Sequence, residues 1–134
     1  MTNIRHCLAL LIVCLLPACA VAEQPDPPPG RELGTLVTGG YEVTLRTECA
    51  EGEVSCERIY ADALALEDNQ TRALSGSTLH TLCADGVSPC RFLGYQLSDD
   101  TYDYRVLENG QLHIQRCDEF GCESIYNEQG QWHF

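Results

Sequence analysis

Six cysteines in residues 49–122 occur as three pairs with the same surroundings. In each, an alternating apolar and polar segment precedes the first cysteine, four or six residues separate the two, and a tyrosine follows the second. The first cysteines recur every 34 positions, and the pairs are Cys49 with Cys56, Cys83 with Cys90, and Cys117 with Cys122. Alternating segments around short turns are typical of β-hairpins. The sequence therefore predicts a threefold repeat of a hairpin that a disulfide closes near its turn.

The spacing of these cysteines favours structural disulfides over chemistry at sulfur. Six cysteines permit many connectivities, but pairing across a short turn brings the two Cα atoms within disulfide distance. A zinc site would normally show two cysteines separated by two residues, or histidines at ligand spacing, and neither pattern is present. The redox C-x-x-C motif is also absent. We therefore expect three sequential disulfides, no metal and no cofactor.

The first 22 residues have the pattern of a secretory signal peptide. A basic residue, Arg5, precedes an apolar run at 8–16 that is too short to cross a bilayer, and small residues end at Ala22. An alternative is that residues 16–19 form a bacterial lipobox, which would leave Cys19 as the lipidated N-terminus. We favour cleavage after Ala22, because a proline just before the small residue, as at Pro17, is atypical of a lipobox. The protein is expected to be periplasmic or secreted, with an envelope-anchored lipoprotein as the less favoured alternative.

The remaining chain divides into a short tether and one domain. Residues 23–32 include four prolines, which favour an extended segment without ladder hydrogen bonds. Residues 33–134 have the size of a single domain. An even number of cysteines in an exported domain is typical of a disulfide framework.

Alternating patterns within residues 33–134 predict an all-β domain. Strands are expected at 35–38, 41–49, 56–66, 71–74, 78–83, 90–97, 102–107, 112–117 and 122–126, with a closing strand at 130–134. Residues 61–66 have helical propensity, but the corresponding segment of the second repeat does not, so we predict a strand there. The turns are placed at Gly39 and Gly40, at Ser75 and Gly76, and at Asn109 and Gly110.

The expected architecture is an antiparallel meander of about nine short strands. Such a sheet must curl to bury one face, so we predict a small barrel or a sandwich, with a β-trefoil-like fold as the second choice. The third repeat differs in register, since Leu112 lies five residues before Cys117 whereas Leu79 lies four before Cys83. One inserted residue is what a β-bulge supplies, so we expect a bulge between His113 and Cys117.

The chain is strongly acidic and contains no lysine. Its 20 acidic and eight basic residues give a net charge of −12, and loss of Arg5 with the signal peptide would make it −13. Such a surface repels nucleic acid and anionic lipid, and it favours basic partners or cations. Membrane association is expected only through a lipid on Cys19. The acidity can equally be an adaptation to a saline habitat, which would imply no partner.

One basic residue follows the strand leucine of each repeat, namely Arg46, His80 and His113. If the three strands project on one side, these residues form a basic row suited to an anionic ligand. The favoured interpretation is that they face solvent and pair with neighbouring acids across the sheet.

Catalytic patterns are absent from the sequence. Ser75 and Ser77 lie near His80 but lack the strand-turn-helix setting of a nucleophile elbow. Acidic residues recur at 67–68 and 99–103 without a calcium-loop motif, so we expect solvated turn residues. A carbohydrate site on Tyr60, Tyr95, Tyr126 and Trp132 is a third hypothesis, but these positions fit a core better. We therefore expect that the protein is not an enzyme.

These features favour an exported, non-enzymatic binding module that inhibits or neutralises a basic protein, such as a lysozyme or the toxin of a rival. The acidity, the predicted disulfide framework and the lack of a catalytic pattern support this hypothesis. The alternative is a structural or stress-related envelope protein with no specific partner. The sequence does not fix an oligomeric state.

Overall fold

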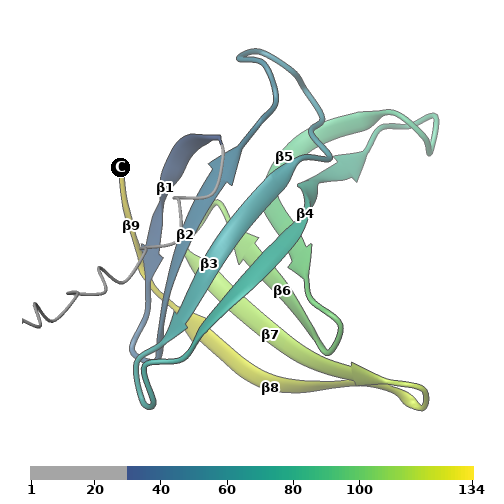
Figure 1. The fold of residues 1–134 in the computed structure, drawn as a ribbon. Helices are drawn as coiled ribbons and strands as arrows, with labels where there is room; N and C mark the ends of the chain where they lie inside the picture. Colours follow the sequence, from purple (N-terminus) through teal and green to yellow (C-terminus); the bar gives the residue numbers. More distant parts are fainter. Residues whose placement is uncertain (1–29) are drawn as a thin grey trace, which may run out of the picture.

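The computed structural model describes residues 30–134, which form nine strands of one curled antiparallel sheet (Figure 1). The strands are β1 (Arg31–Val37), β2 (Tyr41–Thr47), β3 (Ile59–Ala65), β4 (Thr71–Leu82), β5 (Pro89–Ser98), β6 (Tyr102–Leu107), β7 (Gln111–Asp118), β8 (Gly121–Gln129) and β9 (Gln131–His133). Residues 30–134 contain no helix, and hence none long and apolar enough to cross a membrane. The predicted all-β antiparallel meander of nine strands is confirmed. The predicted signal peptide, Cys19 and most of the tether lie outside the described residues.

The strands follow one another in the sheet in sequence order from β8 back to β1, and β9 pairs with the outer side of β1. Alternate residues of each strand point to the concave face, as the period of two predicts. The sheet curls like a half-barrel around a small core of leucine, isoleucine, valine, alanine and one tyrosine (Figure 1). The buried core residues are Leu36, Val43, Leu45, Cys56, Ile59, Ala61, Ala63, Leu74, Leu97, Tyr104, Val106, Leu112 and Ile114.

The predicted turn at Ser75 and Gly76 is wrong, because β4 runs through it as one strand of 12 residues. Gly76 is opposite Ile59 of β3 on one side and Leu97 of β5 on the other. A Cβ atom at position 76 would lie 1.9 Å from the carbonyl oxygen of Gln96. Gly76 therefore allows β4 and β5 to approach closely, which is one common reason for a glycine inside a strand.

Replacing Gly76 with alanine is expected to lower the free energy of unfolding by about 2–3 kcal/mol, because β5 has to move away from β4. Gly39→Ala is the matched control. Its new Cβ would meet only the carboxylate of Glu128, at 3.1 Å, and this side chain end can move. Urea unfolding of both variants measures the difference. Equal destabilisation by the two substitutions would contradict this role of Gly76.

Four register shifts interrupt the ladders. The register between β7 and β8 shifts between Ile114 and Gln115, but the extra residue is Ile125 of β8. β7 pairs with β6 without a shift, so the residue predicted to be inserted between His113 and Cys117 is not found.

The other three register shifts were not predicted. One of them, between His80 and Leu82 of β4, adds a residue to β5 between Pro89 and Phe92. Of the remaining two, one makes Leu33 the extra residue of β1, and the other makes Leu93 the extra residue of β5. Each precedes a glycine with positive φ, Gly34 at 139° and Gly94 at 144°, a region that residues with a Cβ rarely adopt.

The three disulfides pair sequential cysteines, as predicted. Cys49 bonds to Cys56, Cys83 to Cys90, and Cys117 to Cys122. Successive connections of a meander alternate between its two ends, so the disulfides of the β2–β3 and β4–β5 connections lie at one end and that of the β7–β8 hairpin lies at the other (Figure 1). The three stapled connections, at 48–58, 83–88 and 119–120, are called the stapled loops below.

Several predicted strand boundaries differ from the structure, and those of β1, β2 and β3 differ near a cavity at one end of the sheet. β2 ends at Thr47 and β3 begins at Ile59, so the first disulfide lies within a loop rather than in a hairpin ladder. β1 begins at Arg31, two residues before the expected start of the domain. Of the two added residues, Arg31 lines the cavity at this end of the sheet.

The side chain of Tyr126 joins β8 to the turn between β1 and β2. Its hydroxyl accepts a hydrogen bond from the backbone N–H of Gly40 at 3.0 Å, lies 2.8 Å from Thr38 Oγ1 and donates to Glu128 at 2.5 Å. Burial and the Glu128 carboxylate raise the pKa of Tyr126. The predicted C-terminal strand is confirmed as β9, where the Trp132 ring stacks on Phe134.

Candidate functional site

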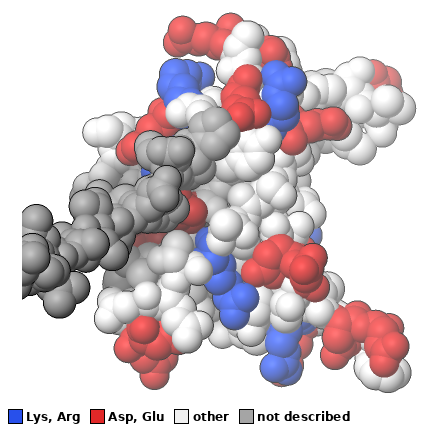
Figure 2. All heavy atoms as spheres, viewed as in Figure 1, with Lys and Arg blue, Asp and Glu red and all other residues white. Residues whose placement is uncertain are grey.

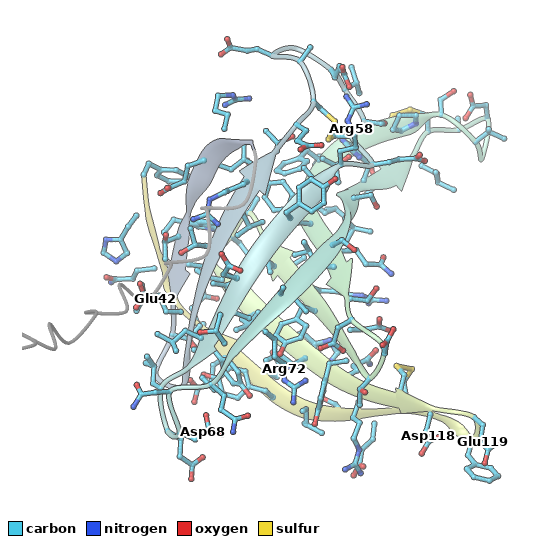
Figure 3. The ribbon with its side chains drawn as sticks, viewed as in Figure 1. Glu42, Arg58, Asp68, Arg72, Asp118 and Glu119 are labelled. Carbon is cyan, nitrogen blue, oxygen red and sulfur yellow. A yellow bond between two sulfur atoms is a disulfide. The ribbon has the colours of Figure 1, made fainter. Side chains whose placement is uncertain are left out.

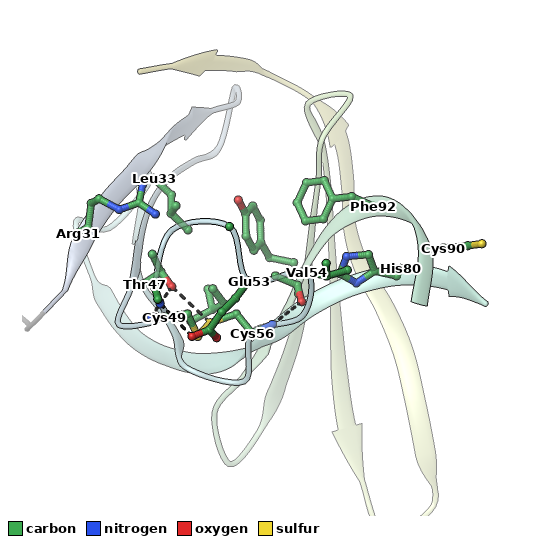
Figure 4. A pocket seen from close by; sticks show the side chains of 15 residues that line it. Arg31, Leu33, Thr47, Cys49, Glu53, Val54, Cys56, His80, Cys90 and Phe92 are labelled. Atoms are coloured by element: carbon green, nitrogen blue, oxygen red, sulfur yellow. Dashed lines mark hydrogen bonds between the residues drawn. A yellow bond between two sulfur atoms is a disulfide. The ribbon is translucent and has the colours of Figure 1, made fainter. Parts of the chain in front are cut away.

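A cavity of about 370 Å³ opens at the end of the sheet that carries the first two stapled loops (Figure 4). The starts of β1 and β5, the ends of β2 and β4, and the loop at 48–58 line it. Its walls combine polar groups with apolar and aromatic side chains, and Leu33, Ile59, Phe92 and Tyr95 are among the latter. Cavities of this volume accommodate small organic molecules.

The bulge at Leu33 turns Arg31 toward this cavity. Residues opposite one another in a ladder project to the same face, and Arg31 is opposite Thr47, which is buried and lines the cavity. Glu32 is opposite Arg46, on the outer face. Without the extra residue, strict alternation from the buried Leu36 would direct Glu32 inward and Arg31 outward. The bulge therefore places a cation where a regular strand would place an anion.

The second unpredicted bulge acts on the opposite wall. Because Leu93 is the extra residue of β5, Phe92 lies opposite His80 and both side chains line the cavity. The His80 ring meets the edge of Phe92 with centroids 5.5 Å apart, and Phe92 meets Tyr95 in the same way at 5.3 Å. Figure 4 shows Phe92 and His80 across the cavity from Arg31. The bulge thus completes an aromatic wall.

The cavity lining includes one arginine, Arg31. Like Arg58, Arg91 and Arg105, it forms no salt bridge with any described residue, whereas Arg46, Arg72 and Arg116 each pair with an acid. Burial raises the pKa of the Tyr95 hydroxyl, and the nearby Arg31 guanidinium opposes that rise. The cavity lining includes one carboxylate, that of Glu53, which accepts a hydrogen bond from the backbone N–H of Ala50 at 3.1 Å.

The predicted basic row of Arg46, His80 and His113 is not assembled. Arg46 lies on the outer face and bonds to Asp62 at 2.8 Å, as the favoured interpretation expected. His80 lines the cavity. His113 lies on β7, three strands away from β4, and does not line the cavity. Its Nε2 is 2.9 Å from Ser124 Oγ. Each of the three residues directly follows a leucine in its repeat, but this shared position did not bring them together on one surface.

Of the acidic residues expected in turns, Asp99 forms hydrogen bonds with nearby groups. Partial burial raises the pKa of Asp99. Its carboxylate also accepts hydrogen bonds from the N–H groups of Thr101 and Tyr102, at 2.8 and 2.7 Å, and from the Arg72 guanidinium. These hydrogen bonds outweigh burial, so the pKa of Asp99 lies below its usual value. The Arg72 guanidinium also lies 4.3 Å from the centre of the Tyr102 ring. Figure 3 shows Arg72 at the end of the sheet opposite Arg58. This cluster stabilises the β5–β6 turn.

One group of side chains has the composition of a metal site. Asp103 Oδ2 lies 3.1 Å from the sulfur of Cys117, and the Cys122 sulfur is nearby. The two sulfurs are bonded to each other, so neither is a thiolate able to bind a metal. Among the described residues this is the one such group, and it carries no metal-binding prediction.

Each stapled loop presents one large apolar side chain to solvent. Val54 is 66% exposed, Val87 81% and Phe120 90%. The sequence contained the signal, since each intercysteine segment holds one such residue among polar ones, but the sequence analysis did not use it. In Figure 2 acidic side chains gather at the upper rim and around the lower right projection, where Figure 3 labels Asp118 and Glu119.

The chain matches no known protein family, no curated protein and no solved structure.

Proposed function

We propose that this protein is an exported, non-enzymatic binding module that binds a basic protein through the acidic β7–β8 hairpin. The observation that carries this proposal is the side chain of Phe120, which is 90% exposed at the hairpin tip. Phe120 directly follows Asp118 and Glu119 in the sequence. An exposed aromatic residue beside carboxylates suits a partner that offers an apolar pocket with a basic rim.

The geometry of the hairpin supports a preorganised contact. Cys117 and Cys122 are opposite one another in the ladder, and the disulfide joins their Cα positions at 4.1 Å. The Asp118 carboxylate accepts a hydrogen bond from the Phe120 N–H at 2.8 Å, which fixes the tip. A tip that is already ordered loses less conformational entropy when it binds.

The other stapled loops support the same type of contact. In the β4–β5 loop, hydrogen bonds from the Ser88 hydroxyl and from the backbone N–H groups of Val87 and Ser88 lower the pKa of Asp85 to about 2. Asp85 therefore keeps its charge in acidic surroundings. The net charge of −12 adds long-range attraction for a basic partner. The three disulfides are consistent with an oxidising, exported environment.

We also infer that the curled sheet closes as a small barrel, which would hold the loops rigidly. The pairing of β9 with β1 and the hydrogen bonds that connect the Tyr126 hydroxyl to Thr38 and Gly40 support closure. The Trp132 indole N–H also donates to the carbonyl of Leu107 at 3.1 Å, which connects β9 to the far side of the sheet.

Affinity capture with two phenylalanine variants tests the proposed function. The oxidised protein is immobilised, exposed to envelope, culture fluid and host secretions, and washed at low and then moderate salt. We expect one basic protein to be released by salt, and Phe120→Ser to reduce its capture by about tenfold, because aromatic anchors dominate binding energy. Phe134→Ser is the matched control, since Phe134 is 97% exposed but lies outside the stapled loops.

The opposite results are equally informative. Undiminished capture by Phe120→Ser would show that the hairpin is not the binding element. An empty eluate from every source would favour the structural or stress-related role, with the acidity as a habitat adaptation.

A further inference from the structure

We propose that the cavity at the mouth of the sheet is a binding site for a small organic anion with an apolar body, of the class of the aromatic carboxylates. The Arg31 guanidinium would hold the carboxylate, and the aromatic wall of Phe92 and Tyr95 would hold the body. This site is independent of the β7–β8 hairpin, which lies at the other end of the sheet.

The placement of Arg31 is the first argument. Seven arginines occur among the described residues against 18 acids, and Arg31 is the one arginine that lines this cavity. Arg31 reaches this position through a bulge, and the bulge requires Gly34 with its φ of 139°. Bulges commonly redirect one side chain toward a site. Arginine binds carboxylates with two parallel N–H bonds.

The aromatic wall is the second argument, and an independent bulge builds it. Gly94 has a φ of 144°, and a Cβ atom there would lie 2.3 Å from the carbonyl oxygen of Val106. The extra residue Leu93 before this glycine directs Phe92 inward beside His80. Two bulges, on strands far apart in the sequence, thus aim complementary groups into one space.

The cavity dimensions and the remaining polar groups define the class of ligand. A volume of about 370 Å³ suits a single ring or a short chain. The Tyr95 hydroxyl lies within the electrostatic influence of Arg31 and can donate a second hydrogen bond to a carboxylate. Glu53, on the loop at the rim, disfavours a second negative charge on the ligand, so a monocarboxylate is the best match.

Three probes of the same shape test the charge requirement. Phenylacetate, phenylacetamide and phenethylamine are titrated into the oxidised protein at millimolar concentration, and backbone amide shifts are followed by NMR. We expect phenylacetate to shift the amides of the cavity lining and to bind about tenfold more tightly than the neutral amide, because it gains a charged hydrogen bond. Phenethylamine is expected to bind more weakly still.

Arginine variants locate the anion. Arg31→Gln is expected to reduce the affinity for phenylacetate to that for phenylacetamide. Arg91→Gln is the matched control, because Arg91 is an exposed arginine of β5 that does not line the cavity. Phe92→Ala is expected to weaken all three probes together. Equal binding of the three probes, an unchanged Arg31→Gln variant, shifts outside the cavity, or no shift at all would each overturn the proposal.

Discussion

Removal of all three disulfides is expected to lower the free energy of unfolding by about 7 kcal/mol. Each disulfide closes a short loop, with sequence separations of 7, 7 and 5 residues. Restriction of the unfolded chain by a loop of this size contributes about 2–2.5 kcal/mol. Because a small domain is typically stable by only about 5–15 kcal/mol, the reduced protein is expected to lose most or all of its stability. Urea unfolding with and without reductant measures the loss.

Paired serine substitutions separate the three contributions. Replacing both cysteines of one disulfide is expected to cost about 2–2.5 kcal/mol. The cost for Cys117 and Cys122 is expected to add to the others, since this disulfide lies at the opposite end of the sheet. Proteolysis of the non-reduced protein provides the control for connectivity and should release three separately linked peptides. A link between different loops would contradict the pairing, and a pair variant as stable as the parent would contradict the contribution of that disulfide.

Raising the pH from about 10 to about 12 is expected to remove roughly 2–3 kcal/mol of stability through Tyr104 alone. Burial, together with the nearby Tyr41, raises the pKa of Tyr104 to about 12. The folded state keeps this proton to a higher pH than the unfolded chain does. Its contribution is therefore fully present below the unfolded pKa and is lost as the pH rises through the folded pKa. Burial also raises the pKa values of Tyr41, Tyr95 and Tyr126, so they act in the same direction.

Denaturant unfolding over this pH range checks the role of Tyr104. Tyr104→Phe keeps the ring in the core and removes the ionisable hydroxyl, so its stability should fall less steeply with pH. Tyr60→Phe is the control, since the Tyr60 hydroxyl lies at the surface beside Glu48. An identical pH slope for Tyr104→Phe and the parent would refute this assignment.

The sequence was most informative where spacing alone determines the structure. Two cysteines that are close in the chain and flank a turn have few alternative partners, and all three predicted disulfides are confirmed. The different offset of Leu112 from Cys117 led to a wrong prediction, because the extra residue of this ladder is Ile125 of β8 and β7 is regular. That prediction assumed that the leucine and the cysteine face the same side in every repeat, and a change of one residue inverts the face.

Glycine was the main source of error, because one residue type serves several purposes in a sheet. Gly76 was taken for a turn but allows β4 to approach β5, whereas Gly34 and Gly94 mark bulges that the sequence analysis did not predict. A lone glycine in a strand pattern is compatible with either role. The sequence alone does not distinguish these roles, because the role depends on which strand lies beside the glycine.

The same limitation explains the outcome at the candidate site. His80 was selected for its place after a leucine, and it does line the cavity, but its neighbours there are Phe92 and Arg31 rather than Arg46 and His113. Arg31 was assigned to the tether, since the proline-rich segment before it concealed the start of β1. Bulges on two strands decide which side chains meet, and their positions depend on tertiary pairing.

The pairing of β9 with β1 has a consequence for the order of the chain. Consecutive strands pair with one another from β1 to β8. The last strand, β9, follows β8 through Gly130 but pairs with β1. Phe134 ends beside Gly34, only a few residues from the start of β1. The first and last strands of the described domain are therefore neighbours in the sheet. Because these two ends lie close together, a linker that joins them, with new ends in an exposed turn, would leave the strand pairings intact.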